Sequence, residues 1–193
     1  MFHIHYINQL DYEILSYPTT LEVDSLLREP YPSVAKAGCG LCCLAMLVEG
    51  LTGCRISMEE WVKRSLASGA NHFGTDMKIL GWETAGEFHL KMEMSSSREA
   101  LRKCLEGGGC AIVNAGRKQG VFSDGGHFLL VVRLEKETAW ILDPSYTEEK
   151  YSKPYRAEKV TKIGDYILAG LDMVCEECSN RDPSFYLFWS DGK

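Results

Sequence analysis

The fold of this chain is decided by residues 37–48, which read AGCGLCCLAMLV. Leu44, Leu47 and Val48 lie three or four positions apart, so the segment is predicted to form a helix that buries one face. Cys39 stands at the first turn of this helix, where unpaired backbone N–H groups and the positive end of the helix dipole favour an anion. Such surroundings lower the pKa of a thiol from about 8.5 to about 3.5–7.5. The segment therefore predicts a nucleophilic thiolate at Cys39 near neutral pH.

Glycines flank this cysteine, and two further cysteines follow it. Gly38 and Gly40 are expected to leave the thiol uncrowded and to let a substrate backbone approach closely. Cys42 and Cys43 fall inside the helix and are interpreted as small core residues. The chain has eight cysteines, too few for a disulfide scaffold, which favours a reducing compartment.

The length and charge of the chain limit its function. Its 193 residues fit a single domain, in which we expect residues 31–190 to form the core and residues 1–30 an N-terminal extension. A net charge of −6 without a Lys/Arg run argues against nucleic acid as a partner. No apolar stretch approaches about 20 residues, so no membrane segment is expected. Because the N-terminus shows no secretory signal, we expect a cytoplasmic protein.

Hydrophobic periodicity predicts further helices and strands along the chain. Helices are predicted over about 57–66, 75–86 and 95–107, and strands over 2–6, 88–94, 110–113 and 185–189. Residues 163–174 fit either a helix or a strand. Residues 146–155 are polar and rich in tyrosine, which makes them a candidate for a mobile flap.

A predicted β-hairpin brings two polar residues to one end. His127 directly precedes the strong β run 128–134, and the returning strand 139–144 contains Asp143 near its end. Simple pairing sets Asp143 opposite about Leu130, three residues short of His127. We therefore expect a β-bulge or a curl of the strand end to bring the two side chains together.

These residues have the types that acyl transfer by a cysteine requires. A thiolate attacks, an imidazole shares its proton, and an acceptor holds the second ring nitrogen. Cys39, His127 and Asp143 stand at a helix start, a strand start and a neighbouring strand end. Gly125 and Gly126 leave room beside the histidine ring. The pattern predicts a hydrolase that needs no cofactor and no metal.

Four short segments carry a family resemblance, namely Ala37–Gly40, Leu44–Met46, Gly125–Phe128 and Leu142–Pro144. In this order they resemble the C39-like branch of the papain-fold cysteine peptidases, over roughly residues 31–144. The resemblance implies an α+β, papain-like fold in which the nucleophile helix of an N-terminal helical part packs on a C-terminal antiparallel β-sheet. It also implies that Cys39 is the nucleophile, that His127 is general base and then acid, and that Asp143 orients the histidine.

The chain departs from this family at two positions. Leu41 stands where members often have proline. Ser33 stands where papain-like enzymes usually carry the glutamine of the oxyanion hole. We expect the Ser33 hydroxyl and the backbone N–H of Gly40 to serve there instead. Loss of one such donor typically costs a factor of about 10²–10³ in rate, which leaves weakened activity open.

The sequence leaves several functions open. The first is a cysteine hydrolase that cleaves a peptide or protein substrate, or another amide, through a thioester acyl-enzyme, with Gly38, Gly126 and Asn71 lining its cleft. The same triad would serve an acyltransferase or transamidase. A peptide-binding domain with weak or lost activity is another alternative. Cys175 and Cys178 form a single C-x-x-C, which leaves a redox protein open but predicts no structural zinc.

Overall fold

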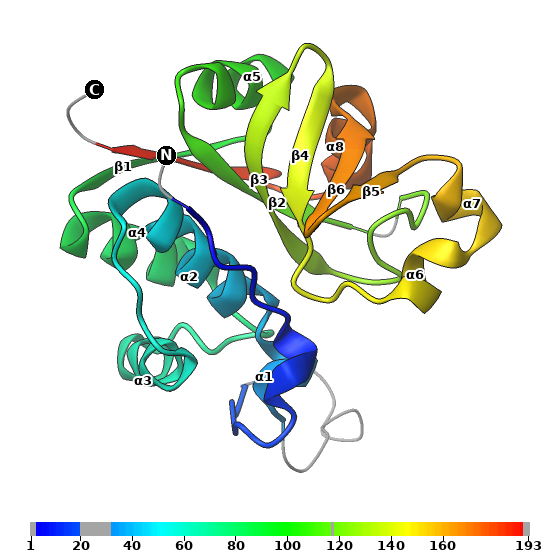
Figure 1. Cartoon of the computed structure of the whole chain (residues 1–193). Coiled ribbons are helices and arrows are strands. Elements are labelled where there is room, and N and C mark those ends of the chain that lie inside the picture. Colours follow the sequence, from blue (N-terminus) through cyan, green and yellow to red (C-terminus); the bar gives the residue numbers. More distant parts are fainter. Residues whose placement is uncertain (1–2, 20–31, 117, 191–193) are drawn as a thin grey trace.

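One antiparallel β-sheet runs through the molecule, and the computed structural model describes residues 3–19, 32–116 and 118–190 (Figure 1). Among these residues the sheet has seven strands in the order β1-β7-β2-β3-β4-β6-β5. They are β1 (Leu90–Ser95), β2 (Cys110–Ala115), β3 (His127–Glu135), β4 (Thr138–Leu142), β5 (Thr161–Ile163), β6 (Tyr166–Gly170) and β7 (Phe185–Ser190). All neighbouring strands pair antiparallel, which confirms the predicted combination of helices with an antiparallel sheet.

Helices cover both faces of this sheet (Figure 1). They are the 3₁₀ helix η1 (Gln9–Tyr12) and the α-helices α1 (Val34–Ala37), α2 (Cys39–Thr52), α3 (Met58–Ser68), α4 (Met77–Glu87), α5 (Arg98–Glu106), α6 (Glu148–Ser152), α7 (Pro154–Ala157) and α8 (Leu171–Cys178). Leu130 and Val132 of β3 pack into the core that contains α2, α3 and α4. Leu129 and Val131 pack into the opposite core, with α5 and α8. Strand alternation thus divides the interior into two cores.

Helix α2 begins at Cys39, where the sequence predicted it, and packs against β3. Gly53 caps its C-terminus: its N–H donates to the carbonyl of Glu49, and its left-handed backbone (φ 76°) turns the chain out of the helix. The sequence predicted that only one face of this helix is buried, but every residue from 40 to 48 is buried. A helix that is apolar on all sides occupies an interior position, and α2 is therefore the centre of one core.

The other local predictions hold in most places. The helices predicted over 57–66, 75–86 and 95–107 correspond to α3, α4 and α5, with Ser57, Asp76 and Ser97 accepting hydrogen bonds at their N-caps. The ambiguous residues 163–174 contain β6 followed by the first half of α8.

The predicted strand over 2–6 is wrong for residues 3–6, and Phe2 lies outside the described residues. Ile4 is buried in the α2 core, and the N–H of His5 donates to the Glu49 carboxylate rather than to a neighbouring strand. The segment instead runs to the end of the β3–β4 hairpin that carries Asp143, where the Tyr6 hydroxyl donates to the backbone carbonyl of Asp143 (2.6 Å). Residues 20–30 of the predicted extension also lie outside the described part of the chain.

Candidate active site

The register of the β3–β4 hairpin places His127 and Asp143 together. Arg133 pairs with Trp140, but Leu130 pairs with Leu142, so the ladder shifts by one residue at Val132. Asp143, the residue after Leu142, therefore lies opposite Leu129 rather than opposite Leu130. Because side chains alternate along a strand, the shift brings Asp143 to the same side as His127 and within diagonal reach of it. The irregularity that the sequence required is therefore present.

Asp143 is fully buried and accepts several hydrogen bonds. Its Oδ1 lies 2.7 Å from Nε2 of His127 and accepts from the backbone N–H of Ser145 (2.8 Å). Its Oδ2 accepts from Nζ of Lys150 (2.6 Å) and from the hydroxyl of Tyr151 (2.7 Å). Burial raises the pKa of Asp143, but the charges and hydrogen bonds of His127 and Lys150 outweigh this and hold the pKa well below its usual range.

His127 is buried between Asp143 and Cys39. Its Nε2 is engaged by Asp143 and by the Ser145 hydroxyl (3.0 Å), which leaves Nδ1 for the thiol. Burial alone would lower the pKa of His127, but the Asp143 carboxylate and the hydrogen bond with Cys39 raise it to about 9. The imidazole is therefore protonated at neutral pH.

Cys39 occupies the first position of α2 and is half-buried. Burial raises the pKa of its thiol. The hydrogen bond and the positive charge of His127, together with the backbone N–H groups of Phe128 and Gly40, lower this pKa by more than burial raises it. The net pKa lies below its ordinary value, which favours the thiolate form of Cys39 beside His127. Cys42 and Cys43, by contrast, are fully buried, and burial raises the pKa of each well above its ordinary value.

A polar cavity of about 420 Å³ opens beside His127. Its walls consist of Gln9, Lys36, Ser123, Asp124, Gly126, His127, Ser145, Thr147, Glu149, Lys150, Lys153 and Arg156. Gln9 is buried there, with its Nε2 donating to the carbonyl of Ala35 (2.7 Å) and its Oε1 left without a partner. Gln9 thus brings an amide to the wall of the cavity from a distant part of the chain.

The glycines beside Cys39 serve packing, which corrects the expectation that they leave open space. A Cβ on Gly38 would lie 2.5 Å from Cγ1 of Val34, and a Cβ on Gly40 would lie 2.6 Å from Cβ of Thr75. The protein itself therefore occupies the space that both glycines leave free.

The remaining predicted site residues lie in different places. Gly126 lines the cavity beside His127. Asn71 donates from Nδ2 to the carbonyl of Pro18 (2.7 Å). Ser33 precedes α1, is buried, and is not among the residues that line the cavity. Its part in an oxyanion hole stays a prediction.

Sequence reasoning missed the groups that surround Asp143 on its far side. The tyrosine-rich segment contains α6 and α7 rather than a simple flap, and Tyr151 is buried. Lys150 and Tyr151 follow Asp143 by seven and eight residues, so one helical turn returns them to its carboxylate. Their nearness in the chain was the available signal. Tyr6 and Gln9 offered no such signal, because they come from the opposite end of the chain.

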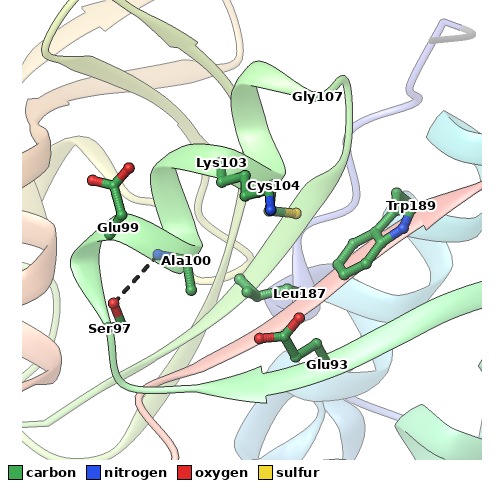
Figure 2. Close-up of a pocket in the computed structure, with 9 residues that line it drawn as sticks. All are labelled: Glu93, Ser97, Glu99, Ala100, Lys103, Cys104, Gly107, Leu187 and Trp189. Atoms are coloured by element: carbon green, nitrogen blue, oxygen red, sulfur yellow. Dashed lines mark hydrogen bonds between the residues drawn. The ribbon is translucent and has the colours of Figure 1, made fainter.

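A second cavity, of about 490 Å³, lies between α5 and strands β1 and β7 (Figure 2). Figure 2 shows Leu187 and Trp189 on the strand side and Cys104 on the helix side. Burial raises the pKa of the Cys104 thiol to about 12, so this thiol is not an activated nucleophile.

Cys175 and Cys178 both lie in α8, and both are free thiols. Burial raises the pKa of each, which makes them poor redox nucleophiles. Within residues 3–19, 32–116 and 118–190, no three metal-binding side chains gather at one point. In the same ranges no helix has the length and apolar character needed to span a membrane.

No family model matches this chain, and no curated protein matches it. Among solved structures, the chain is similar to the crystal structure of a double glycine motif protease from an AMS/PCAT transporter in complex with the leader peptide. The identity is 13% and the TM-score 0.48, over 93% of this chain and 96% of that chain.

Proposed function

We propose that this protein is a cysteine hydrolase that cleaves a peptide or another amide bond through a thioester acyl-enzyme. One observation carries the proposal. The half-buried thiol of Cys39 is paired with His127, whose Nε2 lies 2.7 Å from the buried carboxylate of Asp143. This is the arrangement of nucleophile, base and orienting group that acyl transfer requires.

The reaction follows from the charges of the resting pair. The Cys39 thiolate attacks the substrate carbonyl carbon, and the N–H of Gly40 is the proposed donor to the oxyanion. The imidazolium of His127 gives its proton to the departing amine as the carbon–nitrogen bond breaks, which leaves a thioester. Neutral His127 then takes a proton from water, and the hydroxide adds to the thioester. Collapse of that adduct breaks the carbon–sulfur bond, releases the acid and restores the thiolate–imidazolium pair.

The rate of Cys39 alkylation by iodoacetamide against pH tests this proposal. In the native protein we expect reactivity to persist well below pH 8, because the pKa of Cys39 is lowered. In His127→Ala the midpoint should move toward the free-thiol value of about 8.5, with at least about a tenfold loss of rate at pH 6. Mapping the modified peptide separates Cys39 from the other seven thiols.

Two further measurements decide between activity and binding. Cys39→Ser should bind peptides from a digest without cleaving them, whereas the native chain should release fragments. If both native and His127→Ala profiles rise together near pH 8.5, Cys39 is not activated and the hydrolase proposal fails. If Cys39 of the native chain is activated but the acyl group goes to an added amine rather than to water, the protein is a transferase.

A further inference from the structure

Asn180 and Arg181 lie across the end of the sheet next to His127. Ala115 of β2 pairs with His127 of β3, so Gly116 and Gly126 stand just beyond this last pair. A Cβ on Gly116 would collide with the amide of Asn180, and a Cβ on Gly126 would lie 3.0 Å from Nη2 of Arg181. The two glycines therefore keep a space at the strand ends that these side chains fill.

The chain holds Arg181 firmly in this position. Its backbone N–H donates to the carbonyl of Cys178 (3.0 Å) at the end of α8. The hydroxyl of Ser184 donates to the carbonyls of both Cys178 (2.9 Å) and Arg181 (3.0 Å). The backbone of Arg181 is thus fixed by hydrogen bonds, and its guanidinium lies against Gly126, the residue before the candidate general base.

This guanidinium has no anionic partner within the described residues. Its Nε is buried without a hydrogen bond, and no carboxylate of residues 3–19, 32–116 or 118–190 forms an ion pair with it. By contrast, Arg156, which lines the cavity beside His127, donates to Asp124 (2.8 Å) and to the carbonyl of Gly120 (2.8 Å). A half-buried cation without a partner is costly, and a bound carboxylate repays that cost.

We infer that Arg181 is a specificity residue that binds a carboxylate of the substrate beside the scissile bond. The inference rests on the proposed function, since the carboxylate is placed relative to Cys39 and His127. The chain carries a net charge of −6, so general electrostatic attraction does not draw an anion to this protein. A carboxylate group would instead be selected locally, by the fixed donors of one guanidinium.

Paired alkylating probes test the inference. One set carries an acidic side chain, bromoacetyl-Asp-amide and bromoacetyl-Glu-amide, each compared with its Asn or Gln isostere. The other carries a terminal carboxylate, bromoacetyl-Gly and bromoacetyl-Gly-Gly, each compared with its carboxamide. We expect the native chain to react at least about fivefold faster with the acid of one pair, the size of a partly desolvated ion pair. The responding set identifies the source of the carboxylate.

Variants assign that preference to one side chain. Arg181→Met should reduce the preference to about twofold or less, while Arg181→Lys should keep part of it. Lys63→Met, which removes an exposed charge on α3, should change nothing. Equal rates for acid and neutral isostere in every pair, or a preference that survives Arg181→Met, would overturn the inference. The iodoacetamide profile in the same variants separates this outcome from failure of the hydrolase proposal, because it reports Cys39 activation without any carboxylate.

Discussion

Lys150 places its ammonium 2.6 Å from Oδ2 of Asp143, the carboxylate oxygen that His127 does not use. The same ammonium donates to the Ser145 hydroxyl (2.8 Å) and is almost buried. Burial lowers the pKa of Lys150, and the negative charges of Asp143 and Cys39 act in the opposite direction. Lys150 therefore shares the charge of Asp143 with His127, and it contributes a positive potential at the thiol.

Removal of this charge should move the working pH range of the site. In Lys150→Met the Asp143 carboxylate acts on His127 alone, so the pKa of His127 should rise above about 9. The pKa of Cys39 should rise as well, because a nearby cation is lost. Both limbs of the alkylation profile should shift to higher pH by roughly one unit. Other charged or titratable groups that face this cluster are Tyr6, Tyr151 and Arg156.

Lys153→Met is the matched control, since it removes a more exposed lysine three residues further on. A purely structural role for Lys150 would lower the amplitude of the profile and leave both midpoints in place. That result would contradict the prediction.

Part of the candidate site could be predicted because its reactive residue types stand at the ends of predicted helices and strands. Cys39, His127 and Asp143 each stand where a predicted helix or strand begins or ends, so the sequence could place them near one another. Gln9 could not be found in this way. Its position in the cavity wall depends on a hydrogen bond to the carbonyl of Ala35, which no periodicity encodes.

A single unpaired residue in β3 sets the geometry of the hairpin. Val132 has no partner in β4, and the ladder is offset by one on either side of it. Bulges of this kind re-aim side chains next to active sites. Without it, Asp143 would face away from His127. Turn residues and β propensity predicted the hairpin, but only the need to join two side chains predicted the bulge.

Deletion of Val132 should therefore uncouple Asp143 from His127. In the native chain, Asp143→Asn should slow Cys39 alkylation at pH 6.5 by about tenfold or more. In the deletion background the same substitution should have little further effect, because the contact is already lost. Double-mutant comparison of the four rates measures this coupling. Equal effects of Asp143→Asn in both backgrounds would show that the bulge does not align the pair. Circular dichroism checks that each variant is folded.

For the molecule as a whole, the buried charges make stability depend on pH. The pKa of Asp143 is lowered in the folded state, so its contribution is present above the unfolded value of about 3.9 and is lost as the pH falls. The pKa of His127 is raised to about 9, so its contribution is complete below about 6.5 and is lost as the pH rises through 9. Both contributions are complete between about pH 4 and pH 6.5, so the network should stabilise the fold most in that range.

Urea unfolding at several pH values tests this expectation. Between pH 5 and pH 3 the native chain should lose roughly 1 kcal/mol more unfolding free energy than Asp143→Asn, which has no carboxylate to titrate at that position. The variant should be less stable at pH 5, because Lys150 is left buried without its partner. Parallel losses in the two proteins would place the acid sensitivity elsewhere.

The N-terminal segment touches the hairpin end at three points. Tyr6 donates to the carbonyl of Asp143, Asn8 to that of Tyr146 (2.9 Å), and the N–H of Gln9 to that of Pro144 (2.7 Å). The contacts of Tyr6 and Asn8 span 137 and 138 residues of chain. During synthesis residues 6–9 leave the ribosome well before residues 143–146, so these contacts form late. The proposed cluster of Cys39, His127 and Asp143 thus gains its contacts with residues 6–9 only after residues 143–146 have emerged.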